Sequence, residues 1–227
     1  MKFAVIVFPG SNGDEDAARA VTDVLGMPAD LVWHQTASLD GYDAVILPGG
    51  FAYGDYLRAG AIARFAPAMA AVRAHAAAGR PVLGICNGFQ VLTEAGLLPG
   101  ALLPNDHLQF RSELVDVRVE TVAAPFTSGY HAGEILRLPI AHGQGAYYAD
   151  PATLDDLRAH DQIVFRYAGP NPNGAVDAIA GIRNRAGNVL GLMPHPERAI
   201  HPRLGSADGA GMFTSLLRAW ERVVLHA

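Results

Sequence analysis

The chain contains a single cysteine, Cys86, at a place where a nucleophile could be exposed. The surrounding sequence, from Pro81 to Leu92, reads as a short apolar strand, a tight turn and a helix. Within it, Gly84-x-Cys86-x-Gly88 is the thiol form of the G-x-S-x-G nucleophile elbow, in which small flanking residues let the chain turn sharply. A sulfur at a helix N-terminus is favoured as the reactive thiolate. The alternative is a buried free cysteine that acts as a small apolar side chain.

A thiol nucleophile needs a general base, and the base needs a group that fixes its orientation. His195 and Glu197 lie two residues apart and are separated by Pro196. This proline disfavours helical geometry at His195, and in an extended segment residues i and i+2 point the same way. Glu197 could therefore orient the imidazole of His195 as the base. A surface His-Pro turn is the simpler interpretation of the same residues.

Two further segments could complete a site around Cys86. The pair Gly49-Gly50 follows an apolar run, and a loop without Cβ atoms lets backbone N–H groups approach a substrate oxygen. The N–H groups of Gly50 and Asn87 would then form an oxyanion hole, in which the loss of one donor typically costs ~10²–10³ in rate. Gln90 lies four residues beyond Cys86, on the same helical face, as a possible substrate contact. Paired glycines can also be an ordinary turn, and Gln90 a solvated helix residue.

The elements that must position these residues follow from the apolar pattern. Four runs have the near-continuous apolar character of strands buried on both faces of a parallel sheet: residues 3–8, 44–47, 82–85 and 189–193. In open α/β sheets, ligands bind outside the carboxyl ends of the strands. If the four strands are parallel, the loops that carry Gly50, Cys86 and His195 all lie on one edge of the sheet.

The remaining pattern predicts the fold class. A further strand is expected at 30–35, and helices are expected at 14–25, from Pro67 to Gly79, from the elbow to Ala95 and at about 207–224. After residue 110 the pattern changes from continuous apolar runs to alternating apolar and polar residues. This pattern predicts half-exposed, antiparallel strands at 114–120, 133–138 and 162–168. We therefore expect an α/β fold: three layers, with a mostly parallel central sheet flanked by helices and extended by antiparallel strands. Residues 1–227 are expected to form a single domain.

Composition excludes several classes of function. The net charge of −5 argues against a nucleic-acid surface, which needs clustered basic residues. Lys2 is the only lysine, so the chain has neither a G-x-x-x-x-G-K-[ST] phosphate loop nor a lysine Schiff base. No motif for a metal site occurs, and we expect no metal or other cofactor in this chain. A single cysteine, no signal peptide and no membrane span predict a cytoplasmic protein.

The motifs together resemble those of the class I, or triad-type, glutamine amidotransferases, whose fold is flavodoxin-like. The resemblance rests on Gly84-Ile85-Cys86-Asn87-Gly88-Phe89-Gln90 and Pro194-His195-Pro196-Glu197-Arg198. Further segments narrow it to the glutaminase subunits of phosphoribosylformylglycinamidine synthase: 8–12, 49–58, 141–143, 171–174 and 205–209. The similarity spans essentially the whole chain, and the block from Tyr53 to Arg58 is its most specific part. Gly13 and Gln144 depart from the pattern, where a cysteine and a glutamate are common.

The resemblance implies a nucleophile at Cys86, a base and acid at His195 and an orienting carboxylate at Glu197. It also supports Gly50 and Asn87 as oxyanion donors and Gln90 as a glutamine contact. It implies hydrolysis of glutamine and delivery of ammonia to a large synthetase subunit, with a small accessory subunit assisting, and with ATP and Mg²⁺ bound on the synthetase. Two alternatives are a stand-alone cysteine γ-glutamyl hydrolase and a non-catalytic glutamine-binding module.

Overall fold

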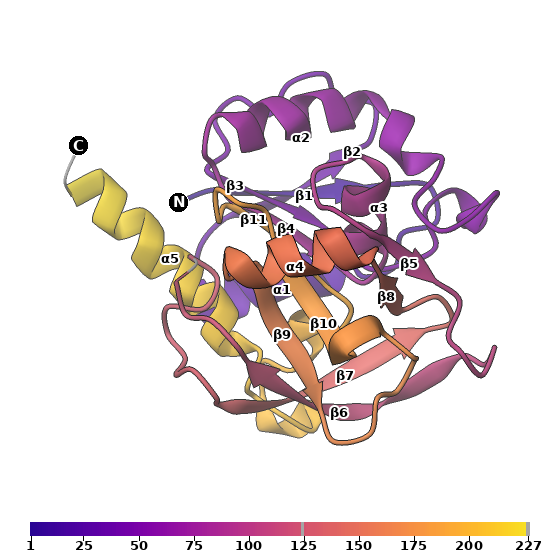
Figure 1. Ribbon diagram of the computed structural model, residues 1–227. Coiled ribbons are helices and arrows are strands. Elements are labelled where there is room, and N and C mark those ends of the chain that lie inside the picture. Colours follow the sequence, from indigo (N-terminus) through magenta and orange to yellow (C-terminus); the bar gives the residue numbers. More distant parts are fainter. Residues whose placement is uncertain (124, 226–227) are drawn as a thin grey trace.

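The computed structural model describes residues 1–123 and 125–225 of the chain, and its centre is a nine-stranded sheet (Figure 1). The strands run in the order β2-β1-β3-β4-β11-β10-β9-β6-β7. The first five are mutually parallel: β2 (Ala29–Trp33), β1 (Phe3–Val7), β3 (Ala44–Leu47), β4 (Val82–Ile85) and β11 (Val189–Leu192). The other four continue the sheet antiparallel: β10 (Ile179–Arg183), β9 (Ile163–Ala168), β6 (Arg111–Val119) and β7 (Ile135–His142). The predicted fold class is confirmed.

The parallel half of the sheet brings distant segments together. Every residue of β3, β4 and β11 is buried, as near-continuous apolar strands require when helices cover both faces. In register, Gly84 of β4 lies beside Gly191 of β11, although more than one hundred residues separate them in the sequence. The loops after these two strands therefore leave the sheet next to each other, at one edge.

Helices cover the sheet on both sides. They are α1 (Asp14–Leu25), α2 (Pro67–Ala77), α3 (Asn87–Glu94), α4 (Pro151–Ala159) and α5 (Ala210–Leu225). The connection from β1 through α1 leads towards the β2 edge, whereas the connection from β3 through α2 leads in the opposite direction along the sheet. Because such crossovers are right-handed, α1 and α2 lie on opposite faces. The C-terminal helix α5 packs against α1, which completes the three layers (Figure 1).

The sequence pattern missed four elements. One is β10, a short run interrupted by Gly181, whose missing Cβ would lie 2.8 Å from that of Leu192. Another is α4, although its start carries a recognisable signal: the Asp150 side chain caps the helix by accepting a hydrogen bond from Thr153 N–H, and proline follows it. The last two are the three-residue strands β5 (Ala101–Leu103) and β8 (Ala146–Tyr148), which form a separate antiparallel pair.

Apart from β3 and β4, each predicted strand differs in its bounds from the observed one by one to four residues, and β6, expected at 114–120, begins three residues earlier, at Arg111. The segment expected at 133–138 is β7, which starts two residues later and continues to His142. This extension carries the chain into the segment 141–145 beside Cys86, called the loop 141–145 below, which comprises the last two residues of β7 and the turn that follows them. The strand expected at 30–35 is β2, which lies one to two residues earlier. None of the helices in the described ranges is both long and apolar enough to cross a membrane.

Candidate active site

Cys86 occupies a sharp turn between β4 and α3. Its backbone has φ 51° and ψ −104°, a conformation that costs a residue with a side chain about 1–3 kcal/mol. The two flanking glycines are required by packing. A Cβ on Gly84 would lie 2.5 Å from Leu92 Cδ1, and one on Gly88 would lie 2.0 Å from the carbonyl oxygen of Leu47. The predicted elbow therefore has the geometry of a nucleophile elbow, with the sulfur at the N-terminal end of a helix.

His195 and Glu197 form a buried pair beyond the end of β11. The Nδ1 atom of His195 lies 2.6 Å from Glu197 Oε1, and both residues are 2% exposed. The surface-turn interpretation of this segment is therefore wrong. The prediction that an extended segment brings the two side chains together is also wrong. His195 is itself extended (φ −106°, ψ 88°), but Glu197 lies in a 3₁₀ turn, Pro196–Arg198, which folds its carboxylate back onto the ring.

The structure places His195 beside Cys86, and Gly49 is the reason that the ring fits there. A Cβ on Gly49 would lie 2.8 Å from His195 Cε1 and 3.7 Å from Cys86 Cβ. Any larger residue at this position would displace the imidazole from its place next to the sulfur. The first glycine of the Gly49-Gly50 pair thus makes room for the base.

The charges around His195 favour its imidazolium form. Burial lowers the pKa of His195, but the charges of Glu197 and of the Cys86 thiolate outweigh burial and raise the pKa to about 10. With Nδ1 bonded to Glu197, the Nε2 atom has no hydrogen-bond partner among the described residues. In its thiol form, Cys86 donates to the carbonyl oxygen of Ala141 at 3.7 Å. On ionisation the sulfur can no longer donate, and the imidazolium becomes its partner.

Two backbone N–H groups near Cys86 are available as donors. Neither Gly50 N–H nor Asn87 N–H donates a hydrogen bond to another described residue. Asn87 is the first residue of α3, where an N–H group has no partner within the helix. Gly50 has φ 145°, and its Cβ would lie 2.6 Å from Ser11 Cα, so only glycine fits in this loop. Both residues predicted as oxyanion donors are therefore next to Cys86 with free N–H groups.

A pocket of about 110 Å³ opens at Cys86. Its walls come from four segments of the chain: Gly50, Phe51, Asp55, Cys86, Gln90, Phe110, Ala141, His142, Gly143 and Gln144. Gln90 is 5% exposed, so its interpretation as a solvated helix residue is wrong. Its side-chain oxygen accepts from Asn87 Nδ2 at 2.8 Å, and its Nε2 donates to the carbonyl oxygen of Gln144 at 2.6 Å. Gln90 thereby joins α3 to the opposite wall of the pocket.

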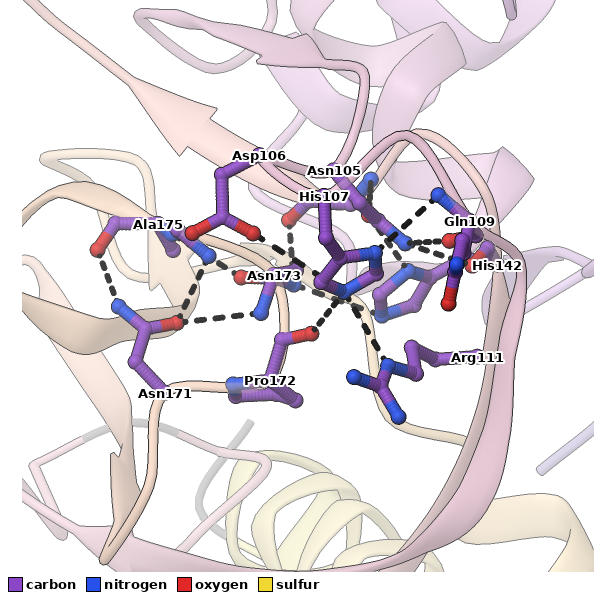
Figure 2. Close-up of polar contacts among 12 residues, drawn as sticks. Asn105, Asp106, His107, Gln109, Arg111, His142, Asn171, Pro172, Asn173 and Ala175 are labelled. Carbon is purple, nitrogen blue, oxygen red and sulfur yellow. Dashed lines mark hydrogen bonds and ion pairs between the residues drawn. The ribbon is translucent and has the colours of Figure 1, made fainter.

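A buried polar network supports that opposite wall (Figure 2). His142 Nδ1 lies 3.1 Å from Asn105 Oδ1, and His142 Nε2 lies 3.4 Å from Asn173 Nδ2. Asn105 also accepts from Gly145 N–H, and Asn173 also donates to Gly145 O. Burial, together with the charge of His195, lowers the pKa of His142 to about 4, so its ring is neutral at neutral pH. The two asparagines and the histidine thus hold the loop 141–145 in place.

Several pocket residues were not identified from the sequence. Asp55, Phe51 and Phe110 line the pocket, and none of them belongs to a short catalytic pattern. For Asp55 the available signal was the family-specific block from Tyr53 to Arg58, which indicated membership and not a role. For His142 the signal was the glycine-rich His-Gly-Gln-Gly segment, for which an ordinary turn is the favoured interpretation from the sequence. No cluster of three or more metal-ligating side chains occurs in the described part of the chain.

Comparisons with known proteins place this geometry in a family. Residues 1–212 match the family model of the CobB/CobQ-like glutamine amidotransferase domain. The chain is similar to a chain in the structure of PurLQS from Thermotoga maritima, with 43% identity and a TM-score of 0.89, over 96% of this chain and 98% of the other.

Two more distant structures share the fold. One is a putative GMP synthase subunit from Thermoplasma acidophilum, with 19% identity, a TM-score of 0.68 and coverage of 100% of this chain and 98% of the other. The second is the glutaminase domain of CTPS from Trypanosoma brucei with bound acivicin, with 16% identity, a TM-score of 0.62 and coverage of 98% and 94%. The chain therefore belongs to the CobB/CobQ-like glutamine amidotransferase family, which confirms the predicted resemblance to glutamine amidotransferases.

Proposed function

We propose that Cys86, His195 and Glu197 hydrolyse glutamine to glutamate and ammonia through a thioester. The observation that carries the proposal is the position of a strained Cys86 beside a buried His195–Glu197 pair. The Cys86 thiolate attacks the side-chain carboxamide carbon of glutamine, and the N–H groups of Gly50 and Asn87 hold the oxyanion. The His195 imidazolium gives its Nε2 proton to the departing ammonia. Neutral His195 then deprotonates a water molecule, which hydrolyses the thioester and releases glutamate.

The chain is a glutaminase subunit of phosphoribosylformylglycinamidine synthase, an enzyme of purine biosynthesis. Its ammonia is used in the ATP-dependent conversion of formylglycinamide ribonucleotide to the amidine. The 43% identity with a PurLQS chain over nearly the full length supports two partners, a large synthetase subunit plus a small accessory subunit. We expect ATP and Mg²⁺ on the synthetase, because Lys2 is the only lysine of this chain and leaves no G-x-x-x-x-G-K-[ST] phosphate loop.

Exposed apolar side chains beside the pocket support a partner at this face. Phe51 and Phe110 line the pocket and are about half exposed. Leu57 and Leu108 lie close to them in the sequence, are 89% and 81% exposed, and have left-handed backbones (φ 68° and 56°). Large apolar side chains held out in this way mark an interaction surface. An ammonia donor needs its outlet covered by the enzyme that consumes the ammonia.

A glutaminase assay with and without the synthetase subunits, ATP and the ribonucleotide tests the proposal. We expect glutamine-dependent amidine formation by the complete system, and its loss in Cys86→Ser, while ammonium chloride restores synthesis with either protein. Full glutamine turnover by the chain alone, unchanged by the other components, would favour the stand-alone γ-glutamyl hydrolase. Glutamine binding without turnover would favour the non-catalytic module.

A further inference from the structure

The pocket at Cys86 has an uneven distribution of charge. Among the described residues that line it, Asp55 is the only carboxylate, and no lysine or arginine is present. His142 is neutral because its pKa is lowered to about 4, and Gln144 carries no charge. A glutamine molecule brings an ammonium and a carboxylate into this pocket together with its side-chain amide. Asp55 is thus the one side chain there with the charge to recognise the ammonium.

The surroundings of Asp55 leave it free to bind a cation. It lies at the end of a 3₁₀ turn, Ala52–Asp55, with a left-handed backbone (φ 54°), and it is partly buried. Its Oδ1 accepts one hydrogen bond, from Asn87 Nδ2 at 3.3 Å. Neither of its oxygens forms an ion pair within the described ranges, and Oδ2 accepts no hydrogen bond there. Burial raises the pKa of Asp55, while the hydrogen bond from Asn87 lowers it. A carboxylate held in this way gains by pairing with a positive group.

Asp55 and Cys86 line the same pocket, as the two ends of one bound glutamine would require. Its hydrogen-bond partner Asn87 follows Cys86 directly in the chain, which connects the Asp55 carboxylate to the turn that carries the nucleophile. In glutamine, three carbon atoms separate the ammonium from the amide carbon. A substrate with its amide at Cys86 can therefore place its ammonium towards Asp55 within the same pocket.

We propose that Asp55 binds the α-ammonium group of glutamine and makes the site selective for an α-amino acid over a simple amide. The inference rests on the proposed function, since it assigns one end of the substrate of that site. Asp55 contributes to binding and not to the chemical step, because the ammonium lies away from the carbon that is attacked. A hydrogen bond between charged groups of this kind changes binding by about 10- to 100-fold.

The test compares two amide donors in the complete synthase. One is glutamine, and the other is glutaramate, which lacks the α-amino group but keeps the same chain and amide. We expect Asp55→Asn to lower kcat/KM for glutamine by about 10- to 100-fold, chiefly through KM, and to leave kcat/KM for glutaramate within about twofold of the wild type. Asp23→Asn, at an exposed position of α1, is the matched control and is expected to change neither value.

Each other outcome overturns the inference. An equal loss with both donors would mean that Asp55 only orients Asn87, and an unchanged kcat/KM for glutamine would mean that it does not touch the substrate. Co-elution of the variant with the other subunits in gel filtration shows that it assembles normally, and equal rates with ammonium chloride, which bypasses this chain, show that the synthetase itself is unaffected. The proposed function fails separately: in that case, Cys86→Ser in the same complex would still use glutamine.

Discussion

At the scale of single residues, the site depends on the charge that Glu197 places beside His195. In Glu197→Gln the neutral amide no longer opposes burial, and burial lowers the pKa of an imidazole. The charge of Glu197 raises the pKa of His195, so in this variant the imidazolium should lose its proton at a lower pH than in the wild type. We expect kcat/KM for glutamine to fall by about 100-fold or more, with the alkaline limb of its pH profile moved to lower pH.

The pH profile of kcat/KM separates this effect from a loss of folding. Glu15→Gln, at an exposed position in the first turn of α1, is the control and should keep the wild-type profile. An alkaline limb that stays in place in Glu197→Gln would show that the carboxylate does not set the protonation of His195.

Prediction from the sequence succeeded for some residues of the site and failed for others. Cys86 could be identified from the sequence because the elbow requires glycine on both sides of the nucleophile, and this pattern is visible in the sequence. At Gly88, for example, there is no room for a Cβ against Leu47. Asp55 could not be found as a pocket residue, because its place depends on a 3₁₀ turn with left-handed residues that no periodicity reveals.

At the scale of elements, the loop 141–145 forms one wall of the pocket and is held by buried hydrogen bonds. Asn173→Ala removes the partner of Gly145 O, of Ala175 N–H and of the Tyr167 hydroxyl. We expect a loss of about 2–3 kcal/mol in the free energy of unfolding, because buried polar groups are left unpaired. We also expect kcat/KM for glutamine to fall by roughly 10-fold, as the wall shifts.

Asn188→Ala provides the matched control for this element. Asn188 is also buried, and its Nδ2 donates to the carbonyl oxygens of Ala76 and Arg80, away from the pocket. Urea unfolding should show a comparable loss of stability, whereas KM for glutamine should stay at the wild-type value. If the two variants affected KM equally, the network around His142 would have no particular role at the pocket.

The elements differ in how well the sequence predicts them. Buried parallel strands such as β4 can be recognised by their continuous apolar residues, and the predicted bounds of this strand, 82–85, agree with the observed ones. Short strands such as β5 and β8, three residues each, are set by their pairing with each other and leave too little pattern to detect. The loop 141–145 was visible as a glycine-rich segment, but its contacts with Asn105 and Asn173 arise only in the folded chain.

At the scale of the whole molecule, one face combines the pocket with exposed apolar side chains. We expect Leu57→Asp and Leu108→Asp each to weaken binding of the synthetase subunits by about 10-fold or more, because both side chains are almost fully exposed and gain burial only in a complex. Isothermal titration calorimetry with the isolated subunits measures this effect. The folded stability of each variant should match the wild type.

Leu225→Asp is the control for the apolar face. Leu225 is 79% exposed and ends α5, on the opposite side of the molecule from β5 and β8 (Figure 1). Its substitution should leave binding unchanged. Equal affinities for all the variants would place the synthetase on another surface. The architecture of three layers was predictable because strand and helix signals alternate. The shared edge of the loops was predicted on the condition that the strands are parallel, which they are, whereas the direct neighbourhood of β4 and β11 follows only from the strand order.

The central claim is that Cys86 forms a thioester with glutamine, with His195 as the acid and base and Glu197 as the carboxylate that orients His195. The most direct measurement is acid quenching of the assembled synthase during turnover with radiolabelled glutamine, followed by peptide mapping of this chain. The account predicts label on the peptide that contains Cys86, and none in Cys86→Ser. Label on a different residue, or glutamine turnover by the Cys86→Ser protein, would contradict it.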